Sequence, residues 1–198
     1  MSVYFPLLFV LMAFFFLYVG IKVITSNKPL LMSSKVFFVF MLVAISPQFI
    51  TSIERLSSSE NAGLVFYIMP LMFLALLGFF WVQMRGVIAI GIFDDSFRDA
   101  LHYSLNENKI KFEEQLSIIK LIEIDAQIQV AIQSWVGTGQ LKLKESNDKR
   151  LLTKLVGGVN DYYESNSVKV NNTTSIFYIV MGVFMLIFSV SSFYLLFH

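Results

Sequence analysis

The chain has 198 residues, of which 56% are hydrophobic, 16% aromatic and only 15% charged, with a formal net charge of +1 and a mean hydropathy of +0.68. A soluble domain is usually about half apolar and about a quarter charged, so this composition favours an integral membrane protein and excludes a disordered, collagen-like or disulfide-rich chain. The near-zero net charge argues against a nucleic-acid partner, whose phosphates need a basic surface. The absence of Cys excludes disulfides, thiolate nucleophiles and Cys-based metal centres.

Four stretches contain no charged residue: Val3–Ile21, Val36–Ile53, Asn61–Met84 and Val170–Phe197. A helix rises about 1.5 Å per residue, so about 20 apolar residues cross the hydrocarbon core of a bilayer. The sequence therefore predicts four transmembrane helices, at about 3–24, 36–53, 63–84 and 171–198, with a separate domain over 85–170. The first stretch lacks the basic start and the cleavage site of a signal peptide, and we expect it to be retained as a membrane anchor.

The distribution of Lys and Arg predicts the orientation. Lys22, Lys28 and Lys35 lie between the first two spans without an acidic residue, and Arg85 follows the third span. Basic residues concentrate in cytoplasmic loops. We therefore expect a multi-pass protein of the cell membrane, with residues 85–170 in the cytoplasm and both termini outside. Two overlapping glycosylation sequons, at Asn171–Thr174, would then face the cytoplasm, and we interpret them as the polar start of the last helix.

The region 85–170 holds 23 of the 29 charged residues and reads as an α+β domain. The β-branched run Val87–Phe93 predicts a buried strand. Asp94-Asp95-Ser96 predicts a helix start, where Ser96 and Asp99 have capping-box spacing, and the helix is expected to end at 106–108. Its predicted core face consists of Phe97, Ala100, Leu101, Ser104 and Leu105.

Apolar and polar residues alternate from Ile122 to Gln133, which predicts a half-buried antiparallel strand. The phase changes after Gly137-Thr138-Gly139, through either a hairpin or a bulge. A last helix is expected to place Leu151, Leu155, Val159 and Tyr162 on one face. The order strand–helix–strands–helix predicts an α+β sandwich of ferredoxin-like pattern.

One polar group interrupts the spans, at Ser46, Pro47 and Gln48. These residues could line a pore or a lipid groove. Alternatively they form a helix kink hydrogen-bonded to its neighbours, which is the interpretation that we favour. The four uncharged stretches contain no ionisable residue, and this argues against an ion-coupled transporter that works alone.

Two groups of residues in the domain are candidate sites. Asp95, Asp99 and His102 share one helix face; this arrangement can bind a divalent metal, but it is also typical of a solvated helix surface, which is favoured. Trp135, with Gly137, Thr138 and Gly139, forms either an interaction loop, docking at the level of the lipid headgroups, or an ordinary hairpin with a core Trp, which is the interpretation that we favour.

The chain carries no phosphate-binding loop, dinucleotide fingerprint, nucleophile elbow or zincin motif, so we expect neither an enzyme nor a cofactor or metal. The main hypothesis is a membrane subunit or scaffold whose cytoplasmic domain contacts other subunits of a complex, or other copies of the chain. The alternative is a homo-oligomeric channel or lipid-handling protein, gated by the domain, with residues 46–48 lining the conduit.

Overall fold

The computed structural model describes residues 4–58, 64–115, 117–124, 126–145 and 149–197. Residues 3, 63 and 198, which the predicted spans include, lie outside this part. The elements, in chain order, are α1 (Tyr4–Ser26), β1 (Leu30–Ser33), α2 (Ser34–Ser58), α3 (Leu64–Gln83), β2 (Val87–Ile90), α4 (Asp94–Glu107), β3 (Phe112–Gln115), β4 (Ile118–Leu121), β5 (Ala126–Gln133), β6 (Thr138–Lys144), α5 (Lys149–Ser165) and α6 (Thr173–Phe197).

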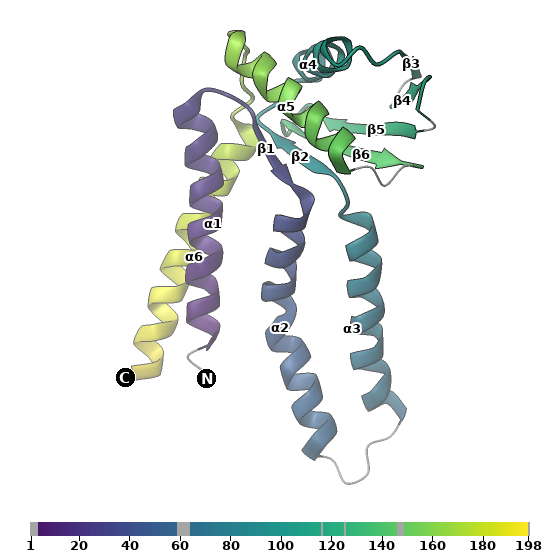
Figure 1. The fold of residues 1–198 in the computed structure, drawn as a ribbon. Helices are drawn as coiled ribbons and strands as arrows, with labels where there is room; N and C mark the ends of the chain where they lie inside the picture. The colour runs from purple at the N-terminus through teal and green to yellow at the C-terminus, as the bar shows by residue number, and fades with distance from the viewer. Residues whose placement is uncertain (1–3, 59–63, 116, 125, 146–148, 198) are drawn as a thin grey trace.

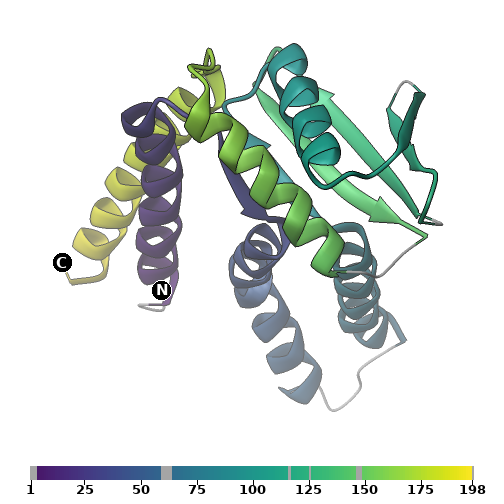
Figure 2. The same ribbon diagram turned by 45° about the horizontal axis from the view of Figure 1, so that its top comes forward.

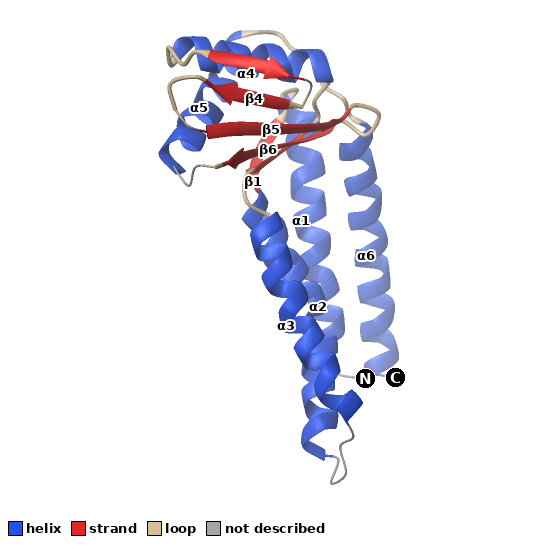
Figure 3. Cartoon of the chain, turned by 90° about the vertical axis from the view of Figure 1, so that its right-hand side faces the viewer, coloured by secondary structure: helices blue, strands red, loops and turns tan. Residues whose placement is uncertain are grey.

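Within the described residues, three helices are long and apolar enough to cross a membrane, over Tyr4–Ser26, Ser34–Glu54 and Thr173–Leu196. The first, second and last predicted spans thus form helices of the length and apolar composition that a span requires. The third stretch forms α3, and the apolar segment found in it, Pro70–Gln83, is shorter than the three segments above. The four helices α1, α2, α3 and α6 all extend from the same side of a β-sheet, and both termini lie at their far ends (Figures 1 and 3).

The sheet has six strands in the order β1-β2-β6-β5-β4-β3, and every neighbouring pair is antiparallel. An α+β arrangement is thus confirmed, whereas the ferredoxin-like pattern stays a prediction. Helices α4 and α5 lie over one face of the sheet (Figure 2). The core between them includes Phe97 and Leu101 of α4, Leu155 of α5, Val130 of β5 and Leu141 of β6, all almost completely buried.

The opposite face of the sheet has two different parts. Near β1 and β2, Ile90 is completely buried against Val19 and Val23 of α1, with Phe37 of α2 and Tyr178 of α6 packed around them. Along β5 and β6, the side chains on this face are polar or small and are partly or fully exposed. We call this second part the open face; it comprises Gln127, Gln129, Ala131, Gln133, Thr138, Gln140, Lys142 and Lys144.

Ring contacts join the apolar helices. Phe15 of α1 stacks on Phe40 of α2, with centroids 4.0 Å apart. Phe38 of α2 meets Trp81 of α3 at 5.2 Å, and Phe16 of α1 meets Tyr178 of α6 at 5.3 Å. These aromatic rings therefore lie between helices, where they fill the space between neighbouring backbones.

Several local predictions need correction. The strand expected from Ile122 begins at Ala126, because Ile122 and Ile124 lie exposed in the turn after β4. The N-cap of α4 is Phe93, without a side-chain cap, and Ser96 instead donates to the Phe93 carbonyl at 3.1 Å, so the capping box is wrong. All five predicted core residues of α4 are buried.

Two further differences concern packing partners. In α5 the buried tyrosine is Tyr163, and the predicted Tyr162 lies at the edge of the core. Strand β1 was not expected from the sequence: it comes from the short segment between α1 and α2 and pairs with β2, with Leu30 opposite Ile90 and Ser33 opposite Val87. The segment before α2 is therefore part of the sheet.

Candidate functional site

The tip of the β5–β6 hairpin carries the most exposed large hydrophobic side chain of the described residues, Trp135, which is 81% exposed. The alternative of a core Trp is therefore wrong. The turn is held by backbone hydrogen bonds: Gly137 N donates to Gln133 O at 2.9 Å, and Gly91 N donates to Gly137 O at 2.7 Å. Of the other predicted loop residues, Thr138 and Gly139 belong to β6, where Gly139 packs closely against Ile92.

The same hairpin tip is fixed to the beginning of α6. Thr174 donates its hydroxyl to Val136 O, and Asn171 donates its side-chain amide to Ser134 O at 2.8 Å. Asn171 Oδ1 accepts from Thr173 N at 3.0 Å, which satisfies one of the free N–H groups at the start of α6. Asn171 and Thr174 therefore start the helix, as interpreted from the sequence, and also bind the carbonyls on both sides of Trp135.

Close approach at this junction requires glycine. Gly137 has φ +76°, and a Cβ atom placed there would lie 2.7 Å from Cγ of Asn171. A positive φ is unfavourable for residues that carry a Cβ atom. The hairpin tip and the first turn of α6 thus form one rigid junction, for which the sequence offered only the Gly137-Thr138-Gly139 turn as a signal.

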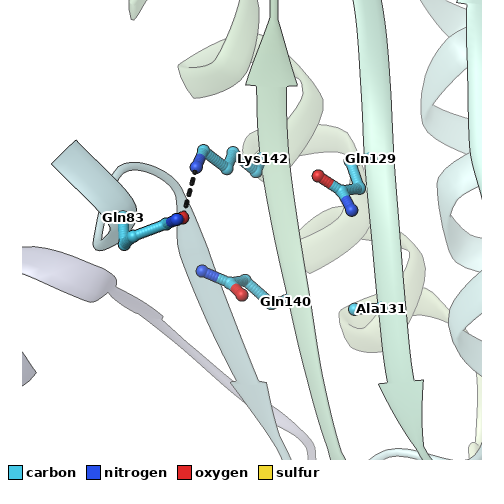
Figure 4. Close-up of a pocket in the computed structure, with 5 residues that line it drawn as sticks. All are labelled: Gln83, Gln129, Ala131, Gln140 and Lys142. Atoms are coloured by element: carbon cyan, nitrogen blue, oxygen red, sulfur yellow. Dashed lines mark hydrogen bonds between the residues drawn. The ribbon is translucent and has the colours of Figure 1, made fainter. Parts of the chain in front are cut away.

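A small polar cavity lies where α3 meets the open face. It has a volume of about 130 Å³ and is lined by Gln83, Gln129, Ala131, Gln140 and Lys142. Figure 4 shows Gln83 at the end of α3 facing β6, where Lys142 donates to Gln83 Oε1 at 3.2 Å. Its polar lining and small size are typical of a hydrated junction between the helix end and the sheet.

The predicted cluster of Asp95, Asp99 and His102 does not form a metal centre: no group of three His, Asp or Glu side chains in the described residues is placed to hold a metal ion. His102 Nε2 instead lies 2.6 Å from Glu114 Oε2 on β3. Arg98 bonds the other oxygen of Glu114 and also Asp94 Oδ1, the latter at 2.8 Å. Burial lowers the pKa of Arg98, but its contacts with Asp94 and Glu114 raise it overall.

This ion-pair network joins α4 to β3. Sequence reasoning missed Arg98 and Glu114 because Glu114 comes from a strand whose register the sequence did not define. The i, i+4 spacing of Asp94 and Arg98 was the only feature of the sequence that indicated part of this network. All four side chains are partly solvated, which is typical of a surface network rather than of a catalytic centre.

In α2, Ser46 and Pro47 contact neighbouring groups. Ser46 donates to Val43 O at 2.7 Å and lies 2.6 Å from the hydroxyl of Tyr4 in α1. Pro47 is buried inside the helix, and Gln48 is exposed. These contacts favour the interpretation of a helix tied to its neighbour. A conduit along residues 46–48 stays a prediction.

Exposed or partly exposed Tyr and Trp residues lie toward both ends of three apolar helices. Near the sheet lie Tyr18 of α1, Trp81 of α3 and Tyr178 of α6, which we call the near belt. At the opposite ends lie Tyr4, Tyr67 and Tyr194, which we call the far belt. The two members on each helix are 14 or 16 residues apart, which corresponds to about 21–24 Å along the axis.

Comparison with protein-family models, curated proteins and solved structures finds no match to the chain. The functional conclusion therefore depends on the geometry of the chain itself.

Proposed function

We propose that the chain is a four-span membrane protein, with α1, α2, α3 and α6 crossing the bilayer, that acts as a subunit or scaffold through its sheet domain. The observation that carries the four-span topology is the pairing of β1 with β2. Helix α2 starts directly after β1, α3 ends just before β2, and Ser34 N donates to Gly86 O at 3.0 Å between them. If α2 crosses the bilayer away from the sheet, the chain must cross again to reach β2, and α3 is the segment that returns.

The length and aromatic pattern of α3 agree with this role. Its 20 residues rise about 30 Å, which is the thickness of the hydrocarbon core. Tyr67 and Trp81 lie near its two ends, at the same spacing as Tyr4 and Tyr18 of α1. Tyr and Trp concentrate at both membrane–water interfaces because their rings are apolar at one end and polar at the other. A near belt and a far belt are the pattern expected of helices that cross a bilayer side by side.

Charge supports a cytoplasmic position of the sheet domain. Lys22, Lys28, Lys35 and Arg85 are exposed and lie next to the sheet. By the positive-inside rule, this distribution supports a sheet domain in the cytoplasm and both termini outside the cell.

The role of subunit or scaffold is supported by the open face. The face of the sheet opposite the open face is covered by α4 and α5. The open face presents amide and ammonium groups: Gln133 and Lys144 are exposed, and Gln129 and Lys142 are half-buried. A row of hydrogen-bonding side chains on a rigid sheet suits a polar contact with another protein. Its position beside the end of α3 suits a partner that lies in or against the same membrane.

Cysteine labelling tests the topology, because the native chain has no Cys. Glu54→Cys marks the far end of α2 and Asn106→Cys the end of α4. In intact cells, a membrane-impermeant maleimide should label the first variant and should label the second only after permeabilisation. Equal labelling of both in intact cells would contradict a four-span topology, and the reverse pattern would invert the orientation.

Mass measurement of the intact assembly tests the role. The chain, tagged at its C-terminus and extracted in mild detergent, should run with other polypeptides in a fixed ratio or as a defined set of copies. A single chain without partners would overturn the subunit role. If only copies appear, Gln48→Ala and Ser46→Ala in liposome flux measurements decide whether the assembly is a conduit.

A further inference from the structure

The exposure of Trp135 is unusual for its residue type. Trp is the largest side chain and is highly buried on average, yet Trp135 is 81% exposed, whereas Trp81 is 49% exposed on the outer surface of α3. An indole left in water contributes little of the stabilisation that burial of its apolar surface would give. A single exposed Trp on a turn held by hydrogen bonds is available for contact with another surface, and its position decides which one.

The position of Trp135 relative to the bilayer follows from the junction with α6. The carbonyls of Ser134 and Val136, on either side of Trp135, accept hydrogen bonds from Asn171 and Thr174. The backbone of Trp135 is therefore held beside the first turn of α6, which begins at Thr173. Tyr178, a member of the near belt, follows just over one turn after Thr174.

The chemistry of the Trp135 side chain and its position beside α6 indicate which surface it contacts. Indole has an apolar ring and one N–H donor, and it is favoured at the level of the lipid headgroups. In the proposed topology, Trp81, Tyr18 and Tyr178 lie at that level on three helices. The hairpin tip presents a fourth ring at the same end of the apolar helices, but from the sheet domain instead of from a span.

We propose that Trp135 inserts into the headgroup region of the bilayer beside α6 and so anchors the sheet domain to the membrane surface. The anchor acts through the junction: Asn171 and Thr174 connect the inserted ring to the first turn of α6, so the domain cannot tilt away from the membrane without displacing that turn. This inference rests on the proposed crossing of the membrane by α6.

Tryptophan fluorescence tests the proposal in the full chain, because Trp81 and Trp135 are the two Trp residues of the sequence. The Trp81→Phe variant leaves Trp135 as the sole reporter. The protein is reconstituted into nanodiscs of phosphatidylcholine and phosphatidylglycerol. We expect emission shifted to the blue of free tryptophan in buffer, loss of quenching by aqueous iodide, and stronger quenching by a headgroup-labelled nitroxide lipid than by lipids brominated deep in the acyl chain.

The matched control is Trp135→Phe, which leaves Trp81 as the sole reporter of α3. If Trp81 is quenched by the lipid probes while Trp135 emits as in water and is fully quenched by iodide, the helices lie in the bilayer and the anchor is wrong. If neither Trp is quenched by the lipid probes, the proposed spanning topology fails as well. Iodide protection of Trp135 without lipid quenching would show that protein covers the ring, and would also overturn the proposal.

Discussion

The neighbouring glycines of α5 have opposite surroundings. A Cβ atom at Gly158 would lie 2.5 Å from Oγ and 3.0 Å from Cα of Ser104 in α4, whereas one at Gly157 would meet nothing within 4 Å. Ser104 is also fixed, because its hydroxyl donates to Leu155 O at 2.8 Å. Glycine therefore lets α4 and α5 approach closely at only one of the two positions.

The predicted effects of alanine at these two positions differ in sign. Gly158→Ala should lower the free energy of unfolding by about 1–3 kcal/mol, because it overpacks the contact between α4 and α5. Gly157→Ala, the matched control, should raise it by about 1 kcal/mol, because alanine favours the helix. Thermal unfolding in mild detergent, followed by circular dichroism, measures both. A loss of stability of equal size in both variants would contradict the proposed close contact.

Tyr163 gives a prediction about pH. The residue is 2% exposed, and its hydroxyl has no hydrogen-bond partner among the described residues. Burial raises the pKa of Tyr163 above its usual value, and the neighbouring Tyr162 adds to the shift. The unfolded chain therefore loses this proton at lower pH than the folded protein. The stability that this difference contributes is complete below about pH 10 and is lost as the pH rises further.

Tyr163→Phe removes both the titrating proton and the unpaired hydroxyl. At neutral pH we expect it to be neutral or to stabilise by about 1 kcal/mol, since a buried hydroxyl without a partner is unfavourable. Above pH 10 the variant should lose less stability than the native chain. Urea unfolding at pH 7 to 11 gives the difference between the two curves. Parallel curves over that range would show that Tyr163 is ionised equally in both states.

Single residues were predictable where a helical period decides the outcome. The five core residues of α4 follow from i, i+3 and i+4 spacing, and all five are buried. The contact of His102 with Glu114 was not predictable, because it depends on how a strand of four residues lies against a helix. After Val159, Tyr162 lies at i+3 and Tyr163 at i+4; both positions fit the helical period, and the structure buries the i+4 residue.

At the scale of elements, α1 and α6 come from the two ends of the chain and pack against each other at small residues. A Cβ atom at Gly182 of α6 would lie 2.7 Å from Cγ of Leu17, and one at Gly20 of α1 would lie 2.7 Å from Ser175 O. Ala13 of α1 is completely buried at the same interface. Close packing of backbones is a main source of helix association in a membrane, where no hydrophobic driving force acts between helices.

Leucine at Gly182 should therefore separate these two helices. Gly182→Leu is expected to lower the free energy of unfolding by about 1–3 kcal/mol or more, through overpacking against Leu17. Gly78→Leu in α3 is the matched control, because no atom lies within 4 Å of its added Cβ. The thermal midpoint in one detergent compares the two variants. An equal midpoint in both would mean that Gly182 lies outside the interface.

Elements were predictable in proportion to their length. The long apolar stretches gave α1, α2 and α6, but β1 has only four residues, between two spans, and its pairing with β2 is not visible in a local pattern. Ile122 and Ile124 continued the alternation of β5 by chance, although a turn separates them from it. Strand ends depend on partners distant in sequence, which a period of two residues does not reveal.

At the scale of the whole molecule, the sheet determines where the apolar helices end. Strand β1 connects α1 to α2, strand β2 follows α3, and Asn171 N before α6 donates to Gly91 O after β2 at 3.0 Å. Four helix ends are thus held at two adjacent strands. The register between β1 and β2 is consequently the feature on which the arrangement of all four helices depends.

A disulfide measures that register. Ser34 N donates to Gly86 O, so the next pair, Ser33 and Val87, is not hydrogen-bonded, and its Cα atoms lie about 4.5 Å apart. This separation suits a disulfide, which accepts about 4.4–6.8 Å between Cα atoms. In a chain without native Cys, Ser33→Cys with Val87→Cys should close on mild oxidation in membranes, seen as the loss of a gel shift by a polymer-linked maleimide.

The control pair is Ser33→Cys with Ala89→Cys, shifted by two residues along β2 on the same side of the sheet. Diagonal neighbours lie about 7–8 Å apart, so this pair should stay reduced under the same oxidant. Equal closure of both pairs would indicate a β1 that slides against β2, and closure of neither would mean that the strands do not pair. In both cases the helices would lose their common point of attachment, and the return of α3 to the sheet would no longer follow from the position of β2.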